Sequence, residues 1–247
     1  MKNRIALVTG GSRGIGKGIA IELAKNGVSV VVTYVKNKKE ADFFCQNIKS
    51  MKGSCATVQM DSKSRGSIKK AVEFARKKFG KIDILINNAA ISQEKPFEGI
   101  TDDDFDKMMN VNLRGPFSLA QELIPDMVTN KWGRVVNIVS IGGQWGGYNQ
   151  VHYAASKAAL INFTQSIAKI YSAQGITSNA ISPGLVATDM TSFELNTTLG
   201  RKKVSEIPAK RLGTTKEIGA AAVYLVSDEA AYITGQTINL NGGMLFS

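Results

Sequence analysis

The fold is decided by Ile5-Ala6-Leu7-Val8-Thr9-Gly10-Gly11-Ser12-Arg13-Gly14-Ile15-Gly16, a short apolar run that ends in a glycine-rich turn. Apolar residues then recur at the spacing of one helix face, at Ile19, Ala20, Leu23 and Ala24. The pattern predicts a strand, a turn and a helix. Glycines let a backbone approach a pyrophosphate, and a helix start offers free N–H groups and the positive end of its dipole. A tight structural turn would also explain the glycines, but their place between strand and helix favours dinucleotide binding.

The alternation of strand and helix continues along the chain. Further strands are expected at 28–35, 54–60, 82–86, 134–140, 176–182 and 237–240. Helices are expected at 41–51, 68–79, 117–127, 151–172 and 217–227, and Thr101 to Asp104 resembles a capping box that begins one more. Such alternation is typical of a parallel, doubly wound sheet. The sequence therefore predicts a single Rossmann-type α/β domain over residues 1–247, with about seven parallel strands flanked by helices.

Composition excludes several other classes of protein. Of the 247 residues, 43% are hydrophobic and 21% are charged, as in soluble globular proteins. The longest stretch without Asp, Glu, Lys or Arg, residues 135–156, is broken by glycines and is not a membrane span. We expect no secretory signal, because the apolar run Ile5 to Val8 is too short for a signal core, and a single histidine leaves no cluster for a metal. We expect Cys45 and Cys55 to be reduced, structural thiols of a cytoplasmic protein.

The formal net charge of +11 suggests an anionic ligand or partner. The lysines are spread over 36–39, 49–52, 63–81 and 201–210 without a known nucleic-acid-binding module. This distribution favours small ligands that carry phosphate, or an acidic carrier protein, over nucleic acid. Part of the charge is explained equally well by solvated helix faces.

A catalytic hypothesis comes from Tyr153 and Lys157, four residues apart in an expected helix, and from Ser140 at the end of an apolar strand. Residues four apart share a helix face, so the Lys157 ammonium is expected beneath the Tyr153 ring. A nearby cation lowers the pKa of a tyrosine and makes it a credible general acid or base. A carbonyl oxygen would be held between Ser140 and Tyr153. Tyr-x-x-x-Lys alone also occurs on ordinary amphipathic helices, so the other motifs have to decide.

The end of the second strand indicates which nicotinamide cofactor is used. Enzymes for NAD usually have an acidic residue there for the ribose 2′-hydroxyl, whereas NADP requires cations for its 2′-phosphate. The chain reads Thr33-Tyr34-Val35-Lys36, without an acid, and Arg13 lies in the glycine turn. The sequence favours NADP, the alternative being that these cations only face solvent.

The combination of Thr9-Gly10-x-x-x-Gly14-x-Gly16, Asn87-Asn88-Ala89, Asn112, Ser140, Tyr153-x-x-x-Lys157 and Pro183-Gly184 resembles the short-chain dehydrogenase/reductases. The resemblance covers Ile5 to Gly243. It implies that Tyr153 protonates the substrate oxygen and that Ser140 orients it. It also implies that Lys157 lowers the Tyr153 pKa and holds the nicotinamide ribose, while Asn112 keeps a water that links Lys157 to solvent.

The resemblance also implies where the cofactor and substrate lie. The expected cofactor-binding residues are Gly10, Ser12, Arg13, Gly14, Ile15, Gly16, Tyr34, Lys36, Asp61, Ser62, Asn88, Ala89, Ala90, Tyr153, Lys157, Pro183, Gly184, Val186 and Thr188. The expected substrate-binding residues are Ser140, Gly142, Gln150 and Tyr153. Residues 141–150 would form one wall of the substrate pocket, and about 190–210 would form a mobile lid.

Within the family the chain is most similar to bacterial 3-oxoacyl-[acyl-carrier-protein] reductases, through residues 227–235 and 241–244. This implies NADPH-dependent reduction of a 3-oxoacyl thioester in fatty acid biosynthesis, by a homotetramer. Gln174, however, stands where such reductases often have an arginine for the acidic carrier. Acetoacetyl-CoA reductase is the close alternative, followed by a reductase of another ketone or sugar. The complete set of four motif residues argues against a non-catalytic NADP-binding regulator.

Overall fold

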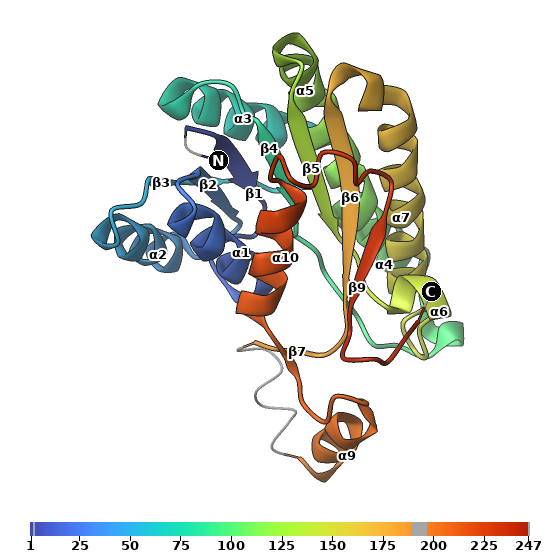
Figure 1. Ribbon diagram of the computed structural model, residues 1–247. Helices are drawn as coiled ribbons and strands as arrows, with labels where there is room; N and C mark the ends of the chain where they lie inside the picture. Colours follow the sequence, from blue (N-terminus) through green and yellow to red (C-terminus); the bar gives the residue numbers. More distant parts are fainter. Residues whose placement is uncertain (2, 189–196, 247) are drawn as a thin grey trace.

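The central element of the protein is a parallel sheet of seven strands, in the order β3-β2-β1-β4-β5-β6-β9 (Figure 1). The structure, a computed structural model, describes residues 1, 3–188 and 197–246. The strands are β1 (Ile5–Val8), β2 (Ser29–Tyr34), β3 (Cys55–Gln59), β4 (Ile84–Asn87), β5 (Gly133–Ile138), β6 (Ile176–Pro183) and β9 (Thr237–Leu240). The chain runs outward from β1 through β2 to β3, then restarts at β4 on the other side of β1. The expected doubly wound α/β fold is confirmed.

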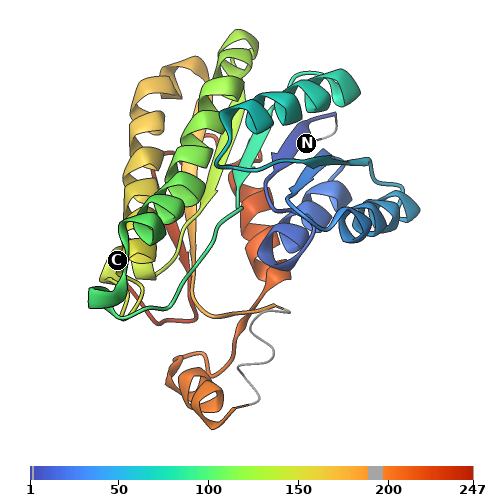
Figure 2. The ribbon, with the colours of Figure 1, turned by 180° about the vertical axis from the view of Figure 1, so that it is seen from behind.

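Helices cover both faces of this sheet because its strands are apolar on both sides. In β1, Ala6 and Val8 pack into one core cluster, while Leu7 packs into the other. The first cluster takes in α1 (Gly14–Lys25), α2 (Lys38–Ser50) and α10 (Thr215–Leu225). The second takes in α3 (Arg65–Phe79), α5 (Gly115–Asn130) and α7 (Val151–Tyr171), which lie in front in Figure 2.

Several short elements were not expected from the sequence. The glycine-rich 141–150 region contains one helical turn, α6 (Gly142–Trp145). The expected lid contains α9 (Thr198–Glu206), while 189–196 lie outside the described residues. The remaining short elements are 3₁₀ turns η1 (Phe97–Gly99) and η3 (Ser172–Gln174) and a small parallel pair, β7 (Val186–Ala187) with β8 (Gly213–Thr214). Two-residue strands and single helical turns are too short to produce a periodic pattern.

The helix that begins at the capping box changes type before it reaches Gly115. Thr101 and Asp104 exchange the two side-chain bonds of a capping box at the start of α4 (Asp102–Met109). The next residues form a π-helix, η2 (Asn110–Arg114), which leads directly into α5. The helix that begins at the capping box and the helix expected at 117–127 are therefore one continuous helix with one widened turn. Such π-turns occur frequently at functional sites.

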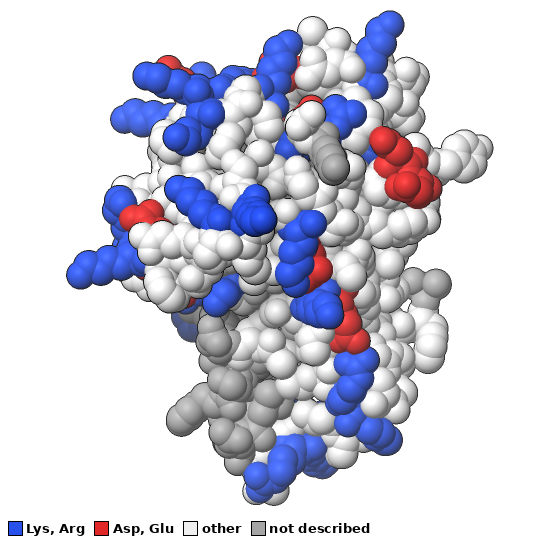
Figure 3. Space-filling model, turned by 60° about the vertical axis from the view of Figure 1, so that its left-hand side comes forward, with Lys and Arg blue, Asp and Glu red and all other residues white. Residues whose placement is uncertain are grey.

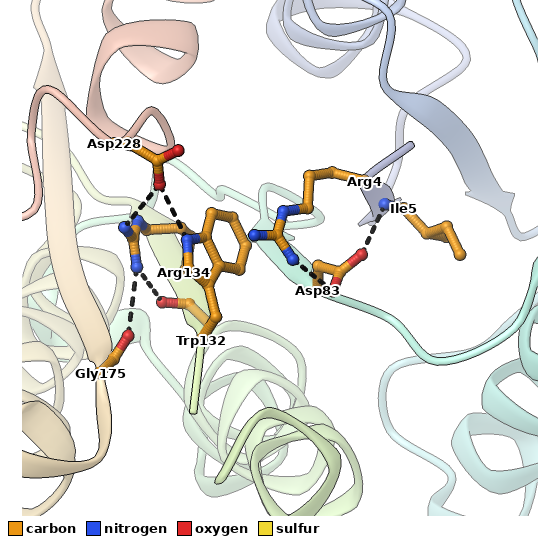
Figure 4. A network of polar contacts seen from close by, with 8 residues as sticks. Arg4, Ile5, Asp83, Trp132, Arg134, Gly175 and Asp228 are labelled. Carbon is orange, nitrogen blue, oxygen red and sulfur yellow. Dashed lines mark hydrogen bonds and ion pairs between the residues drawn. The ribbon is translucent and has the colours of Figure 1, made fainter. Parts of the chain in front are cut away.

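The amino-terminal edge of the sheet is held by a polar cluster around Trp132 (Figure 4). The guanidinium carbons of Arg4 and Arg134 lie 3.7 and 4.2 Å from the Trp132 ring centroid. Arg4 pairs with Asp83 at 3.4 Å, and Arg134 pairs with Asp228 at 3.5 Å. These contacts join the chain around β1, β4 and β5 at the edge opposite the strands' carboxyl ends. They stabilise the scaffold and do not take part in the site.

The two cysteines differ from the expectation. Cys45 on α2 and Cys55 on β3 are joined in a disulfide, with their Cα atoms 5.2 Å apart. The expectation of two separate reduced thiols was therefore wrong. The sequence pattern showed a helix and a strand but not that the turn between them returns the chain so closely, which brings both Cα atoms within disulfide range.

Candidate active site

The residues expected at the site gather at one edge of the sheet because they follow the carboxyl ends of parallel strands. The glycine turn follows β1, Asn88 follows β4, Ser140 follows β5 and Gly184 follows β6. The order of strands reverses between β1 and β4. In doubly wound sheets this switch point is where ligands bind.

The glycine turn has a shape that other residues would not permit. Gly10 and Gly14 adopt left-handed φ angles of +60° and +53°. A Cβ on Gly16 would lie 2.4 Å from Asn88 Nδ2 and 2.5 Å from the Gly10 oxygen. The turn therefore presses α1 against the end of β4, as the close helix–strand packing of dinucleotide-binding folds requires.

Asn88 and Thr9 fix this turn against β4. The Asn88 amide donates hydrogen bonds to the main-chain oxygens of Thr9 and Gly10, at 2.8 and 3.2 Å. The Thr9 hydroxyl oxygen accepts bonds from the main-chain N–H groups of Asn88 and Ala89, both at 2.9 Å. The side chain of Asn88, an expected cofactor-binding residue, thus holds the shape of the turn.

The start of α1 is suited to an anion. Arg13 occupies the N-cap position with no side-chain cap bond, and the first turn contains no acidic residue. The first N–H groups of a helix lack partners within the helix, and the helix dipole is positive there. Together with the glycine turn, this arrangement fits the pyrophosphate of a dinucleotide.

The ends of β2 and β3 supply the next group of expected contacts. After Tyr34, the side chain of Lys36 is exposed, and Arg13 is also exposed at the turn. Ser62 is buried and packs against Gly115, where a Cβ would lie 2.9 Å from the Ser62 Cβ. The Asp61 carboxylate accepts a bond from the Lys63 main-chain N–H at 3.0 Å. It does not cap α3, whose N-cap is Ser64.

Lys157 lies beneath the ring of Tyr153, one helical turn along α7. Its Nζ is 5.7 Å from the ring centroid and donates a 2.8 Å hydrogen bond to the main-chain oxygen of Ile138. The Lys157 side chain is buried, and burial lowers its pKa to about 8. The α6 turn packs closely against α7 at Lys157. A Cβ on Gly143 would lie only 2.8 Å from the Lys157 backbone.

The pKa of Tyr153 differs from the sequence-based expectation. Burial raises the pKa of the phenol, and a hydrogen bond with Ser140 opposes that rise. The expectation considered the charge of Lys157 but not the removal of the phenol from water, which disfavours its charged form. At neutral pH Tyr153 is therefore protonated and poised as an acid. The Ser140 Oγ also accepts a bond from the Gly142 N–H at 3.1 Å.

Asn112 lies in the π-helix η2 and is 1% exposed. Its amide accepts a bond from the Ile91 N–H and donates one to the Ile91 oxygen, both at 2.9 Å. It also donates to the Ser156 hydroxyl at 3.1 Å. The side chain thus satisfies the backbone groups of a neighbouring segment. It ties the chain after β4 to the helix that carries Tyr153 and Lys157.

The segment after β6 comes back to the glycine turn. Val186 is buried in β7, and a Cβ on Gly14 would lie 3.8 Å from Thr188 Cγ2. The Pro183 oxygen accepts a bond from the Ile141 N–H at 3.3 Å, beside Ser140. The segment from Pro183 to Thr188, which contains expected cofactor-binding residues, therefore connects the surroundings of Ser140 with the glycine turn.

Sequence reasoning missed the contacts of two residues in this region. Gln144 on α6 donates bonds of 2.7 Å to Ser182 Oγ and to Asn239 Oδ1, and so fixes α6 to β6 and β9. His152, for which its place beside Tyr153 allows a position at the pocket mouth but favours a surface or packing role, is 1% exposed and lies 2.9 Å, Nε2 to Oε1, from Gln93. Both partners are distant in the sequence, and no local pattern signals such pairs. The expected substrate residue Gln150 bonds to Glu94 at 3.3 Å.

Basic side chains are scattered in separate groups over the face shown in Figure 3, with acidic ones between some of them.

Within the described ranges, no group of three or more His, Cys, Asp or Glu side chains is arranged to hold a metal ion. Across the same part of the chain, no helix combines the length and apolarity needed to cross a membrane.

Comparison with known proteins gives consistent relatives. The family model described as enoyl-(acyl carrier protein) reductase matches residues 10–245. The 3-oxoacyl-[acyl-carrier-protein] reductase of Staphylococcus epidermidis is 36% identical over 242 residues, 98% of this chain and 99% of that protein. The reductases of the same name from Buchnera aphidicola and Aquifex aeolicus are 40% and 38% identical, over 98% and 99% of this chain and 97% and 98% of those proteins.

Proposed function

The chain belongs to the short-chain dehydrogenase/reductase family, and we propose that it reduces a 3-oxoacyl thioester to the 3-hydroxyacyl thioester with NADPH, as in fatty acid biosynthesis. It is an oxidoreductase acting on the CH–OH group. One observation carries the proposal. Tyr153, with Lys157 beneath its ring and Ser140 bonded to its hydroxyl, stands at the sheet edge that also holds the glycine turn.

The proposed chemistry divides between cofactor and protein. When bound, the nicotinamide supplies a hydride to the carbonyl carbon. The Ser140 hydroxyl orients the carbonyl oxygen, and Tyr153 donates its proton to that oxygen. Lys157, protonated below its pKa of about 8, stabilises the phenolate that remains. Asn112 holds the neighbouring chain in place and would keep the water that returns a proton.

NADP is the cofactor we propose, in place of NAD. The chain from the end of β2 carries no acid at Tyr34, Val35 or Lys36, and Arg13 lies at the start of α1. A 2′-phosphate needs cations, whereas an acidic residue would repel it. Gly10, Ser12, Gly14, Ile15 and Gly16 would surround the pyrophosphate. The remaining contacts would come from Asp61, Ser62, Ala89, Ala90, Pro183, Gly184, Val186 and Thr188.

The acyl group would be linked to an acyl carrier protein, as the names of the relatives state for those enzymes, or to coenzyme A. Gln174 is exposed in η3, where an arginine would serve an acidic carrier better. This observation keeps acetoacetyl-CoA reduction as a second candidate. We further propose a homotetramer in the cytoplasm, with residues about 190–210 as a lid over the site. The disulfide weighs against that compartment.

The test is NADPH oxidation with acetoacetyl-CoA and with the carrier-linked 3-oxoacyl thioester, compared with NADH and with a panel of other ketones and sugars. We expect turnover of the thioesters with NADPH. If neither thioester is turned over while another ketone is, the thioester assignment fails and the family assignment stands.

A further inference from the structure

The segment Gln93 to Lys95 (the 93–95 segment) follows β4. It lies beside the residues that lead into α7 and is hydrogen-bonded to them. The Lys95 N–H donates to the Asn149 oxygen at 2.8 Å. The Gln150 amide donates to Glu94 at 3.3 Å, and His152 Nε2 lies 2.9 Å from Gln93 Oε1. The three contacts run in opposite directions along the two segments. They end one residue before Tyr153.

Asp104 determines how the hydrogens of this cluster are arranged. Hydrogen bonds from Lys95 and Gln93 hold the pKa of the Asp104 carboxyl well below its usual range. An ionised carboxylate only accepts hydrogen bonds, so the Gln93 Nε2 group, 3.0 Å away, is the donor. The Gln93 oxygen therefore faces His152, and the hydrogen between the two residues is on His152 Nε2.

The other ring nitrogen of His152 supports the same assignment. Nδ1 is buried and finds no hydrogen-bond partner among the described residues. A hydrogen on Nδ1 would be left without an acceptor in the interior, which is costly. The chain of donors thus has one direction, from His152 to Gln93 to Asp104. Lys95 closes it with a 2.6 Å ion pair to Asp104.

The 93–95 segment is also fixed at its other end. Asn112 binds both main-chain groups of Ile91. The chain from Ile91 to Lys95 is therefore held at one end by Asn112 and at the other by the residues before Tyr153. Through Asn149 and Gln150 the segment also contacts the end of the 141–150 region, the expected wall of the substrate pocket.

We propose that His152 is a positioning residue: through Gln93 and Asp104 it fixes the 93–95 segment as a second wall beside Tyr153, and so sets the affinity for the acyl ketone. This inference rests on the proposed function. The proton transfer itself belongs to Tyr153, so His152 acts on substrate binding and not on the chemical step.

The test compares His152→Ala with His152→Gln. A glutamine places its amide nitrogen close to the position of Nε2 and keeps the donor to Gln93. Loss of one buried neutral hydrogen bond corresponds to about a five- to tenfold change in an equilibrium. We expect His152→Ala to raise KM for acetoacetyl-CoA by about that factor, with kcat and the NADPH Kd within about twofold, and His152→Gln to restore KM. Gln93→Leu should match His152→Ala, and the double variant should be no worse.

The matched control is Thr164→Val, on the same helix. Thr164 is fully buried and accepts a 2.9 Å hydrogen bond from Asn137, far from the 93–95 segment. The Thr164→Val variant should have a lower Tm than the parent chain and an unchanged KM for acetoacetyl-CoA. An unchanged KM in folded His152→Ala, or no rescue in folded His152→Gln, would overturn the proposal.

A second readout does not depend on turnover. Amide hydrogen exchange at Lys95 should be faster in His152→Ala than in the parent chain and should return to the parent rate in His152→Gln, because the Lys95 N–H bonds to Asn149. If exchange behaves this way while the parent chain reduces no thioester, the segment is positioned as described and the substrate assignment alone has failed. Equal exchange in all three proteins would overturn the positioning itself.

Discussion

The Lys157 ammonium donates a hydrogen bond to the main-chain oxygen of Ile138, the last residue of β5. The position of the Lys157 nitrogen is therefore held by the backbone of β5, two residues before Ser140. This bond keeps the nitrogen beneath the Tyr153 ring. This relationship fixes the position of the Lys157 nitrogen, whereas its charge is lost as the pH rises through its pKa of about 8.

Tyr153→Phe tests the proposed acid. The variant keeps the ring above Lys157 but removes the proton donor and its bond with Ser140. General acid catalysis contributes about 10²- to 10⁴-fold, so kcat should fall by that factor while the NADPH Kd stays within about twofold. Steady-state kinetics and fluorescence titration measure both. Retained turnover would remove Tyr153 from the mechanism.

Lys157→Met tests the buried charge through stability. Burial lowers the Lys157 pKa from 10.5 to about 8, so between those values the unfolded chain keeps a proton that the folded chain has lost. The free energy of unfolding should therefore gain a rising contribution as the pH increases through that window. Below about pH 8 the cost of burying the charge remains in full. Urea unfolding of the parent chain and of Lys157→Met at several pH values measures this contribution. If the two proteins' free energies of unfolding depend on pH in the same way, the prediction is wrong.

Asn112→Leu tests the support of the chain after β4. The change leaves the Ile91 N–H and oxygen without their partner and should cost about 1–3 kcal/mol in the free energy of unfolding. Activity should fall as well, because the 93–95 segment begins two residues later. Thr164→Val provides a comparison for a buried hydrogen bond outside the site. An Asn112→Leu protein with parent stability would show that the Ile91 contacts contribute nothing.

Gly16→Ala tests the glycine turn. A Cβ there would lie 2.4 Å from Asn88 Nδ2 and 2.5 Å from a backbone oxygen, so the turn has to move. We expect NADPH binding to weaken at least tenfold, about 1.4 kcal/mol. Gly66→Ala is the control, because it lies in the first turn of α3 with its nearest neighbour atom at 3.9 Å. It should bind cofactor normally and be as stable as the parent chain or more so.

The double variant Arg13→Ala with Lys36→Ala tests cofactor choice. If these cations face the 2′-phosphate, loss of charged hydrogen bonds of about 1.5–3 kcal/mol should raise KM for NADPH by about ten- to a hundredfold. KM for NADH should change little, since NADH lacks that phosphate. A parent enzyme that prefers NADH, or a variant that weakens both cofactors equally, would refute the NADP assignment.

The sequence was informative wherever structure is determined by nearby residues. The glycine turn, the capping box at Thr101 and the four-residue spacing of Tyr153 and Lys157 are local patterns, and parallel strands bring their carboxyl ends to one edge. Contacts between distant residues have no such signal. Gln93 and His152 are 59 positions apart, and the Cys45–Cys55 bond depends on how tightly one turn closes. The direction of the Tyr153 pKa also required a structure, because the burial that raises it cannot be seen in the sequence.

The widened turn at Asn110–Arg114 changes which face of the continuous helix from α4 to α5 is buried. Each extra residue in a turn rotates the following side chains by about 100°. Before and within the turn, Met108 and Asn112 are the buried residues; beyond it, the buried face carries Leu119, Leu123 and Met127. The phase shift allows one end of the rod to direct an amide toward Ile91 while the other end buries its apolar side chains against the sheet.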